Sequence, residues 1–429
     1  SPQTIYDNFQ GRDKAEKIRN YIIDCYQNAG GTYFILGGDD KFVPIRYGIP
    51  LEIPPQTPRE EDSIPCDLYF SDLTGNWNED NDDYWGEFND DTPDRYPEVF
   101  VGRITAFVPQ EAQNWVTKAL HYEKTPGIMF DEALWLYTPD PDTGAAPQAF
   151  PHHITQTYAC DYNADAALYE IDKGFAFLNV NCHGANWNID PKTPPGYYLR
   201  NFWFLPPDEH NAGLNQLTNT NKYFVGYSIS CYCGAFDHLV SNSTDTCVAD
   251  AMVDAYQNIG ASTYLVNTRN GFHTPSKQLQ YEFWNRIMSP WWIGPSPPEP
   301  SLTRVGVAEA MSKCAETMNW NSYGGRYIIY THTLFGSPYS ETWTNIPSQM
   351  VVSHPLTILK GVQTNFTVTV TNNLGFPIQY AKVCLHKSQP GFTDIYEVGH
   401  TNASGQVTFT IKPRTTGTMK VTVTRLHNA

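Results

Sequence analysis

The chain has 429 residues, a net charge of −17, 41% hydrophobic residues and 17% charged residues. This length and composition are typical of a globular protein with two or three domains. No apolar run approaches the roughly 18 residues of a membrane span, and the first residues lack the basic and apolar regions of a signal peptide. We therefore expect no membrane span, and a signal peptide that is absent or already removed.

The negative charge is concentrated in one segment. Residues 60–98 contain 14 Asp or Glu against one Arg, a net charge of −13. From residue 349 to the end, seven Lys or Arg stand against two Asp or Glu, a net charge of +5. An acidic chain without a basic stripe offers little to a phosphate backbone, so we expect no nucleic-acid partner.

The cysteines and sequons indicate the compartment. Nine cysteines are an odd number and too few for a disulfide scaffold at this length. Asn242, Asn365 and Asn402 begin N-glycosylation sequons, and the chain is poor in Lys. We therefore expect a secreted or cell-surface protein.

Helical patterns alternate with buried strands through the first four fifths of the chain. This alternation indicates an α/β fold with mainly parallel sheets. We expect one domain over residues 1–347, with subdomains of about residues 1–128 and 129–347. The predicted helices cover residues 12–29, 111–123, 246–258, 276–288 and 305–318, and the predicted strands cover residues 32–37, 98–104, 133–137, 174–184, 223–231 and 261–267.

The pattern changes from residue 348 onward. Short segments with period-2 alternation, such as NFTVTVTN and GQVTFTIK, are separated by turn signals such as NNLG and NASG. This spacing predicts an immunoglobulin-like β-sandwich over residues 348–429. We expect this domain to make contacts with the cell surface.

An acidic loop covers residues 72–94, between the predicted strands at 32–37 and 98–104. Short oxygen-bearing side chains alternate in it and a glutamate follows, which is how a loop wraps Ca²⁺. Asp83 stands where an EF-hand has glycine, so the pattern is not an EF-hand. The alternative is a solvated acidic loop without a cation. The predicted ligands of a structural Ca²⁺ are Asp72, Asn78, Asp80, Asp82, Tyr84 and Glu87.

Two buried strands end in side chains that can do chemistry. The segment GFAFLNVNCHG ends at His183 and Gly184, and YFVGYSISCYCGAF reaches Cys231. Parallel strands bring their carboxyl ends to one edge, where ligands collect in α/β sheets. A thiol beside an imidazole is the minimum for nucleophilic catalysis, and the N–H groups of Gly184 and Cys231 would form an oxyanion hole.

Other roles for these residues stay open at this point. Cys231 alone would more often be a buried structural thiol. Cys182, His183, Cys231 and Cys233 would supply a Cys₃His zinc site, although alternation along a strand points Cys182 away from His183. Asp140, in the TPDPD turn after the strand at 133–137, would orient the imidazole or serve only as a turn carboxylate.

Several blocks resemble the gingipain-type cysteine peptidases, which share a fold group with caspases and legumains. The blocks are YFILGGDD, the acidic loop followed by YPEVFVGRI, then NCHG, SISCYCGAF and HTLFGSPYSE. The resemblance covers roughly residues 30–343. It implies a caspase-like catalytic domain followed by an immunoglobulin-like domain. It further implies that Cys231 is the nucleophile, that His183 is the general acid and base, and that Asp140 is an acidic residue near the histidine.

The sequence departs from this family in its expected substrate pocket. The resemblance places a carboxylate for basic substrates about eleven residues after the position of Asp140, in a region where this chain reads AAPQAFPHH. Arg269 and Phe272 follow the next strand, where the family lines that pocket. We therefore predict an endopeptidase that does not cleave after Arg or Lys, with an acidic or apolar P1 preference. The alternatives are an inactive adhesion or binding protein on the same fold, or the zinc protein.

Overall fold

The chain divides into two compact units, one ending at Thr344 and the other following from Asn345. No helix in the described part of the chain is long and apolar enough to cross a membrane. The predicted boundary at residues 347–348 and the sequon at Asn242 lie outside the described residues. The computed structural model describes residues 1–52, 58–125, 131–140, 142–192, 198–200, 211–237, 246–288, 303–346 and 349–425.

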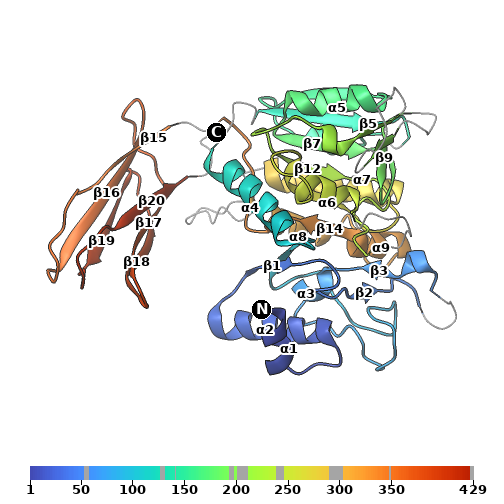
Figure 1. Ribbon diagram of the computed structural model, residues 1–429, viewed down its shortest axis with the longest axis horizontal. Helices are drawn as coiled ribbons and strands as arrows, with labels where there is room; N and C mark the ends of the chain where they lie inside the picture. The colour runs from blue at the N-terminus through green and yellow to red at the C-terminus, as the bar shows by residue number, and fades with distance from the viewer. Residues whose placement is uncertain are drawn as a thin grey trace. The chain divides into compact units, whose positions relative to one another are not determined.

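An eight-stranded sheet, counted over the described residues, organises the first unit (Figure 1). Its order is β1-β4-β14-β13-β12-β7-β5-β6. Every neighbouring pair is parallel except β13 and β14. The strands are β1 (Tyr33–Gly37), β4 (Phe100–Ile104), β5 (Glu132–Tyr137), β6 (Thr155–Cys160), β7 (Phe177–Asn181), β12 (Phe224–Ser228), β13 (Ala261–Asn267) and β14 (His332–Phe335).

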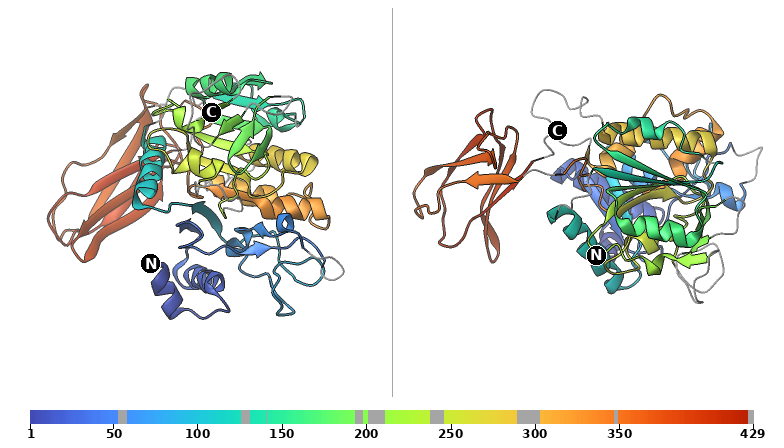
Figure 2. Two further views of the ribbon diagram at one scale, coloured as in Figure 1. Left: turned by 45° about the vertical axis from the view of Figure 1, so that its right-hand side comes forward. Right: turned by 90° about the horizontal axis from the view of Figure 1, so that it is seen from above.

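Helices cover both faces of this sheet, as Figure 2 (right) shows. Alternation along β5 directs Leu134 and Leu136 to the core shared with α5 and α6, and directs Trp135 to the core shared with α7 and α8. The helices are α1 (Pro2–Asn8), α2 (Lys14–Ala29), α3 (Leu68–Ser71), α4 (Pro109–Lys124), α5 (Ala164–Lys173), α6 (Val248–Val253), α7 (His273–Met288), α8 (Val305–Lys313) and α9 (Tyr323–Thr331).

Small elements surround the sheet. β8 (His183–Ala185), β9 (Asn188–Asp190), β10 (Tyr198–Arg200) and β11 (Asn211–Gly213) form a second sheet in the order β11-β10-β9-β8. β2 (Tyr47–Gly48) pairs with β3 (Ile64–Pro65). The 3₁₀ helices are η1 (Glu60–Asp62), η2 (Ala146–Ala149) and η3 (Leu214–Gln216).

The predicted elements of the first unit are found with shifted ends. The predicted helix at 12–29 is confirmed as α2, where the Asp13 side chain accepts a hydrogen bond from Glu16 N–H. Gly30 ends it in the left-handed region. The predicted strand at 174–184 is two strands, because the chain leaves the sheet after Asn181 and turns into the β8–β9 hairpin. The predicted helices at 246–258 and 305–318 are shorter and end at Val253 and Lys313.

The second unit contains two three-stranded antiparallel sheets in its described residues. One has the order β15-β16-β19 and the other β18-β17-β20, and both contribute to one apolar core. The sequence did not predict β15, which is largely exposed. The strands are β15 (Met350–Ser353), β16 (Thr364–Asn372), β17 (Lys382–Gln389), β18 (Phe392–His400), β19 (Gln406–Ile411) and β20 (Lys420–Thr424).

The sheet of the first unit runs continuously across the predicted subdomain border, because β14 pairs with β4 at Phe335 and Arg103. At this seam, where β4 lies beside β14, there is no space for a side chain on Gly102. A Cβ atom there would lie 2.3 Å from the carbonyl oxygen of Gly336. The division of residues 1–347 into two subdomains stays a prediction.

We expect Gly102→Ala to lower the free energy of unfolding by about 1–3 kcal/mol, because backbone at the seam must move to admit the methyl group. Urea unfolding followed by tryptophan fluorescence measures the change. The matched control is Gly37→Ala on the neighbouring strand β1, where an added Cβ meets nothing within 4 Å. Equal stability of the two variants would contradict close packing at the seam.

Candidate active site

The carboxyl ends of four parallel strands meet at one edge of the sheet. β5, β7, β12 and β13 run in the same direction, with β7 and β13 on either side of β12. The segments that follow them carry Asp140, His183, Cys231 and Arg269 respectively. The order of the strands therefore gathers residues that lie far apart in the sequence.

The histidine segment packs directly against the cysteine segment. A Cβ atom on Gly184 would lie 2.6 Å from Cys233 Sγ, 2.9 Å from Ser230 Cβ and 3.1 Å from the carbonyl oxygen of Cys231. Only a glycine allows this approach of the two backbones. Gly184 thus brings the start of β8 into contact with the loop after β12.

The Cys231 thiol lies in a half-buried position next to the loop after β13. The backbone N–H of Gly271 donates a hydrogen bond to Cys231 Sγ at 3.2 Å. Burial raises the pKa of the Cys231 thiol, and the Gly271 N–H opposes that rise. The next residue, Tyr232, has φ of 57°, a left-handed conformation that turns the chain sharply away from the strand.

His183 is exposed at the start of β8, and no hydrogen bond joins its ring to Cys231. Asp140 and His183 likewise form no hydrogen bond or ion pair with each other. Asp140 Oδ1 instead lies 3.2 Å from His273 Nε2, at the first residue of α7. The structure therefore pairs Asp140 with a histidine that the sequence analysis did not consider.

Arg269 is buried beneath the site. Its guanidinium donates to both carboxylate oxygens of Asp237, at 3.0 and 2.5 Å, and to the carbonyl oxygens of Ser63 and Thr268. Acceptors of the protein itself therefore engage the guanidinium. A place for Arg269 in the substrate pocket stays a prediction. Phe272 packs against Tyr327, with ring centroids 4.6 Å apart.

A cavity of about 520 Å³ opens beside the cysteine loop. Both acidic and basic side chains border it, and the Arg269 guanidinium contributes little net charge because Asp237 neutralises it. The lining residues are Arg59, Glu60, Glu61, Asn186, Tyr232, Ala235 and Arg269.

The thiols of the zinc alternative point to different places. Cys182 Sγ contacts the carbonyl oxygen of Leu136, and Cys233 Sγ contacts that of Asn188, each at 3.4 Å. Both side chains are buried, whereas His183 is exposed. These residues do not form a group with ligand atoms within 4.8 Å of one another, so the described structure offers no Cys₃His site.

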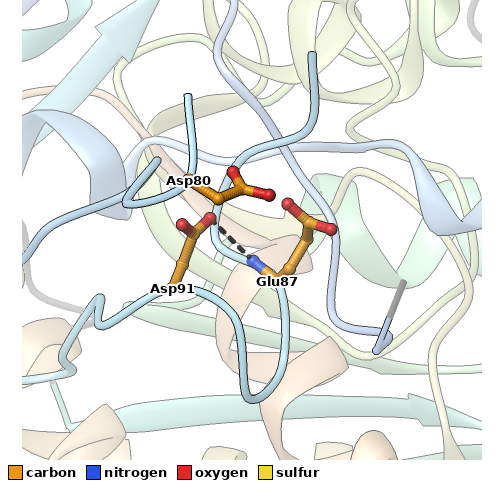
Figure 3. Close-up of side chains that lie close together, drawn as sticks. All are labelled: Asp80, Glu87 and Asp91. Atoms are coloured by element: carbon orange, nitrogen blue, oxygen red, sulfur yellow. Dashed lines mark hydrogen bonds between the residues drawn. The ribbon is translucent and has the colours of Figure 1, made fainter. Parts of the chain in front are cut away.

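The acidic loop holds a compact carboxylate group that differs from the predicted one. Asp80, Glu87 and Asp91 have carboxylate oxygens within 4.8 Å of one another (Figure 3). Asp72 lies outside the group, because its carboxylate accepts hydrogen bonds from Trp77 Nε1 and from backbone N–H groups of the same loop.

The other predicted ligands fall into two classes. Asp82 Oδ1 accepts the N–H of Tyr84, and the carbonyl oxygens of both residues accept from Asn78 Nδ2. Asn78 Oδ1, in contrast, is buried without a hydrogen-bond partner. Asn78 therefore fits an oxygen-ligand role, and Asp82 and Tyr84 have internal functions in the turn.

Glu87 supplies the sharpest test of whether a cation fits. Its side chain is 0% exposed, and neither carboxylate oxygen has a hydrogen-bond partner. Burial, followed by the charges of Asp82 and Asp91, raises the pKa of Glu87 to about 8. A buried carboxylate without a donor is costly unless a proton or a cation neutralises it, so this group fits Ca²⁺.

Sequence reasoning missed Asp91, Asp237 and His273. Asp91 belongs to a dense run of acidic residues that the sequence shows. The sequence does not show which of these side chains point toward Glu87. Asp237 and His273 carry no local signal, because their partners lie 32 and 133 residues away along the chain.

The model of peptidase family C25 matches residues 1–343 of the chain. The chain is 23% identical over 364 residues to gingipain R2 of Porphyromonas gingivalis strain W83, which covers 82% of this chain and 43% of that protein. It is also 23% identical over 358 residues to gingipain R1 of Porphyromonas gingivalis, covering 80% of this chain and 31% of that protein. The chain therefore spans less than half the length of these relatives.

Solved structures show the same fold. The Arg-specific cysteine proteinase gingipain R superposes with a TM-score of 0.70 at 18% identity, covering 98% of this chain and 87% of that one. The complex of the RgpB pro- and mature domains of Porphyromonas gingivalis gives a TM-score of 0.71 at 18% identity, with coverages of 96% and 87%.

Proposed function

The chain belongs to peptidase family C25, and on that premise we propose that it is a cysteine endopeptidase. Cys231 is the nucleophile, and His183 is the general acid and base. The observation that carries this assignment is the contact of Gly184 with the Cys231 loop, where an added Cβ would lie 3.1 Å from the Cys231 carbonyl oxygen. It places the histidine and the thiol on adjoining segments of one sheet edge.

The reaction is an acyl transfer in two steps. Cys231 Sγ, as the thiolate, bonds to the carbonyl carbon, the C–N bond breaks, and the protonated His183 gives its proton to the leaving amine. Water then attacks the thioester while His183 takes its proton, and the C–S bond breaks to return Sγ. The N–H groups of Gly184 and Cys231 hold the oxyanion in both steps.

The absence of a direct Cys231–His183 hydrogen bond suits this mechanism. A substrate carbonyl enters between the two side chains, so the thiol and the ring act from opposite sides. The Gly271 N–H at 3.2 Å supports the thiolate in the meantime. Asp140 would then act on His183 only indirectly, because its carboxylate is engaged by His273.

For the substrates we propose proteins or peptides with an acidic or apolar residue at P1. The segment after Asp140, residues 145–153, contains no acidic residue that could pair with Arg or Lys. Phe272 lies three residues beyond Arg269 and stays half-exposed against Tyr327, so it offers an apolar wall. Arg269 contributes through its backbone and its ion pair.

We further propose that Asp80, Glu87, Asp91 and Asn78 hold a structural Ca²⁺. The cation would neutralise carboxylates that otherwise repel one another. The loop is tied to α9, because Tyr330 Oη donates to the carbonyl oxygen of Gly86 at 2.7 Å. An ordered loop therefore supports the helix that leads into β14.

The second unit completes the proposal as an immunoglobulin-like β-sandwich. Two sheets that share one core support this assignment. We propose that the protein is secreted or exposed on the cell surface, with this unit in contact with that surface.

We expect Cys231→Ala to lower peptide hydrolysis by about a thousandfold or more, because the variant loses the thiol on which the proposed acyl intermediate forms. The rate of release of new amino termini from a mixed peptide library measures it. The matched control is Cys25→Ala on α2, a half-buried free thiol remote from this edge. An unchanged rate in Cys231→Ala would refute the nucleophile, and an inactive wild type would favour the binding-protein alternative.

Cleavage sites in the same library should show Glu, Asp or apolar residues at P1, and few Arg or Lys residues, since residues 145–153 contain no carboxylate. Mass spectrometry of the products gives the distribution. Strong selection for Arg or Lys at P1 would overturn the proposed specificity.

Removal of calcium with EDTA should lower the melting temperature by about 5 °C or more, because a ligand at a hundred times its Kd contributes about 2.7 kcal/mol. Glu87→Gln should remove this calcium dependence. Asp83→Asn, an exposed carboxylate of the same loop, is the matched control and should keep it. Scanning calorimetry measures both, and a calcium response preserved in Glu87→Gln would contradict the site.

A further inference from the structure

We propose that the buried ion pair of Arg269 and Asp237 is a positioning device for Cys231. The pair locks the loop after β12 onto the loop after β13, so that the N–H of Gly271 faces Cys231 Sγ. Both residues act through the backbone and neither touches the substrate. This inference rests on the proposed role of Cys231.

The two loops already continue the pairing of β12 and β13. Tyr232 N–H donates to the carbonyl oxygen of Arg269 at 2.8 Å, and Gly234 N–H donates to that of Asn267 at 2.9 Å. Asn267 Nδ2 donates to the carbonyl oxygen of Ile229 at 3.0 Å. These hydrogen bonds hold the loops together on both sides of Cys231. None of them reaches Asp237, at the far end of the cysteine loop.

The ion pair with Arg269 fixes Asp237, and with it the far end of the cysteine loop. Asp237 follows Cys231 by six residues, and its carboxylate receives two nearly parallel N–H groups of Arg269. The side chains are 0% and 1% exposed, so water neither competes for the pair nor screens it. The planar guanidinium fixes direction as well as distance, which a single ammonium cannot do.

A third part of the chain supports the same pair. Tyr47 Oη on β2 donates to Asp237 Oδ2 at 3.1 Å, and Arg269 Nε donates to the carbonyl oxygen of Ser63 beside β3. The backbone N–H of Arg269 donates to Thr331 Oγ1 at the end of α9. Arg269 is therefore the point at which the β2–β3 hairpin, α9 and the cysteine loop meet.

The consequence for Cys231 follows from two close contacts. Gly271 stands two residues after Arg269, and a Cβ on it would lie 2.1 Å from the carbonyl oxygen of Ile229. This close contact fixes the position of the loop after β13 against the cysteine loop. In that position the backbone N–H of Gly271 lies 3.2 Å from Cys231 Sγ. A displacement of this loop away from Cys231 would lengthen and weaken this hydrogen bond.

The test uses Arg269→Lys in the full chain, which keeps the charge and removes the paired geometry. We expect iodoacetamide to alkylate Cys231 about tenfold more slowly at pH 7, with the half-maximal rate at higher pH, because a hydrogen bond to the thiolate is weakened. We also expect kcat to fall more than KM rises. Mass spectrometry of the Cys231 peptide separates this thiol from the other eight.

Two further variants make the result specific. Arg304→Lys weakens another arginine pair in the same unit, between the buried Arg304 and the partly exposed Glu341, and should leave Cys231 alkylation within twofold of wild type. Tyr47→Phe removes only the hydroxyl bond to Asp237, at a partly exposed residue, and should slow alkylation about two- to threefold. It decides the question if Arg269→Lys does not fold.

The inference is overturned if folded Arg269→Lys keeps the wild-type alkylation profile, or if Arg304→Lys slows alkylation equally. With Arg269→Lys unfolded, an unchanged profile in Tyr47→Phe overturns it. A wild type that cleaves no peptide, together with a shifted profile in Arg269→Lys, would refute the peptidase and uphold the positioning role.

Discussion

The parallel pairing of β7, β12 and β13 is the constraint on which the rest of the first unit depends. Parallel strands end at the same edge of a sheet, and their crossovers must pass over its faces. The helices between them fill those faces, and the segments after the strands carry His183, Cys231 and Arg269. Close packing of two backbones at Gly184 then converts a shared edge into a direct contact.

Charge is handled in opposite ways at the two polar centres of this unit. Around Arg269 the chain supplies its own counterion, and removing one partner of such a buried pair typically costs about 3–5 kcal/mol. At Glu87 the chain supplies only more carboxylates, and burial together with their charges raises the pKa of Glu87 to about 8. The first arrangement is complete within the protein, whereas the second calls for a proton or a cation from solution.

These centres are linked through α9. Thr331, at its end, accepts the N–H of Arg269, and Tyr330 holds the carbonyl oxygen of Gly86 in the acidic loop. The helix continues directly into β14, which joins β4 to the strands that end at the site. Order in the acidic loop and order at the cysteine therefore share one structural element, which explains how a remote cation would support a family C25 peptidase.

The sequence by itself determined the α/β alternation, the change to short strands near residue 348, the acidic loop and the two strand ends at His183 and Cys231. These features depend on periodicity and on local turn residues, which are written in consecutive positions. It could not determine that Asp140 meets His273, that Asp237 neutralises Arg269, or that Asp91 replaces Asp72 in the carboxylate group. These contacts join residues that only folding brings together. Burial then decides which charged side chains are paired within the protein and which are available to a substrate or a cation.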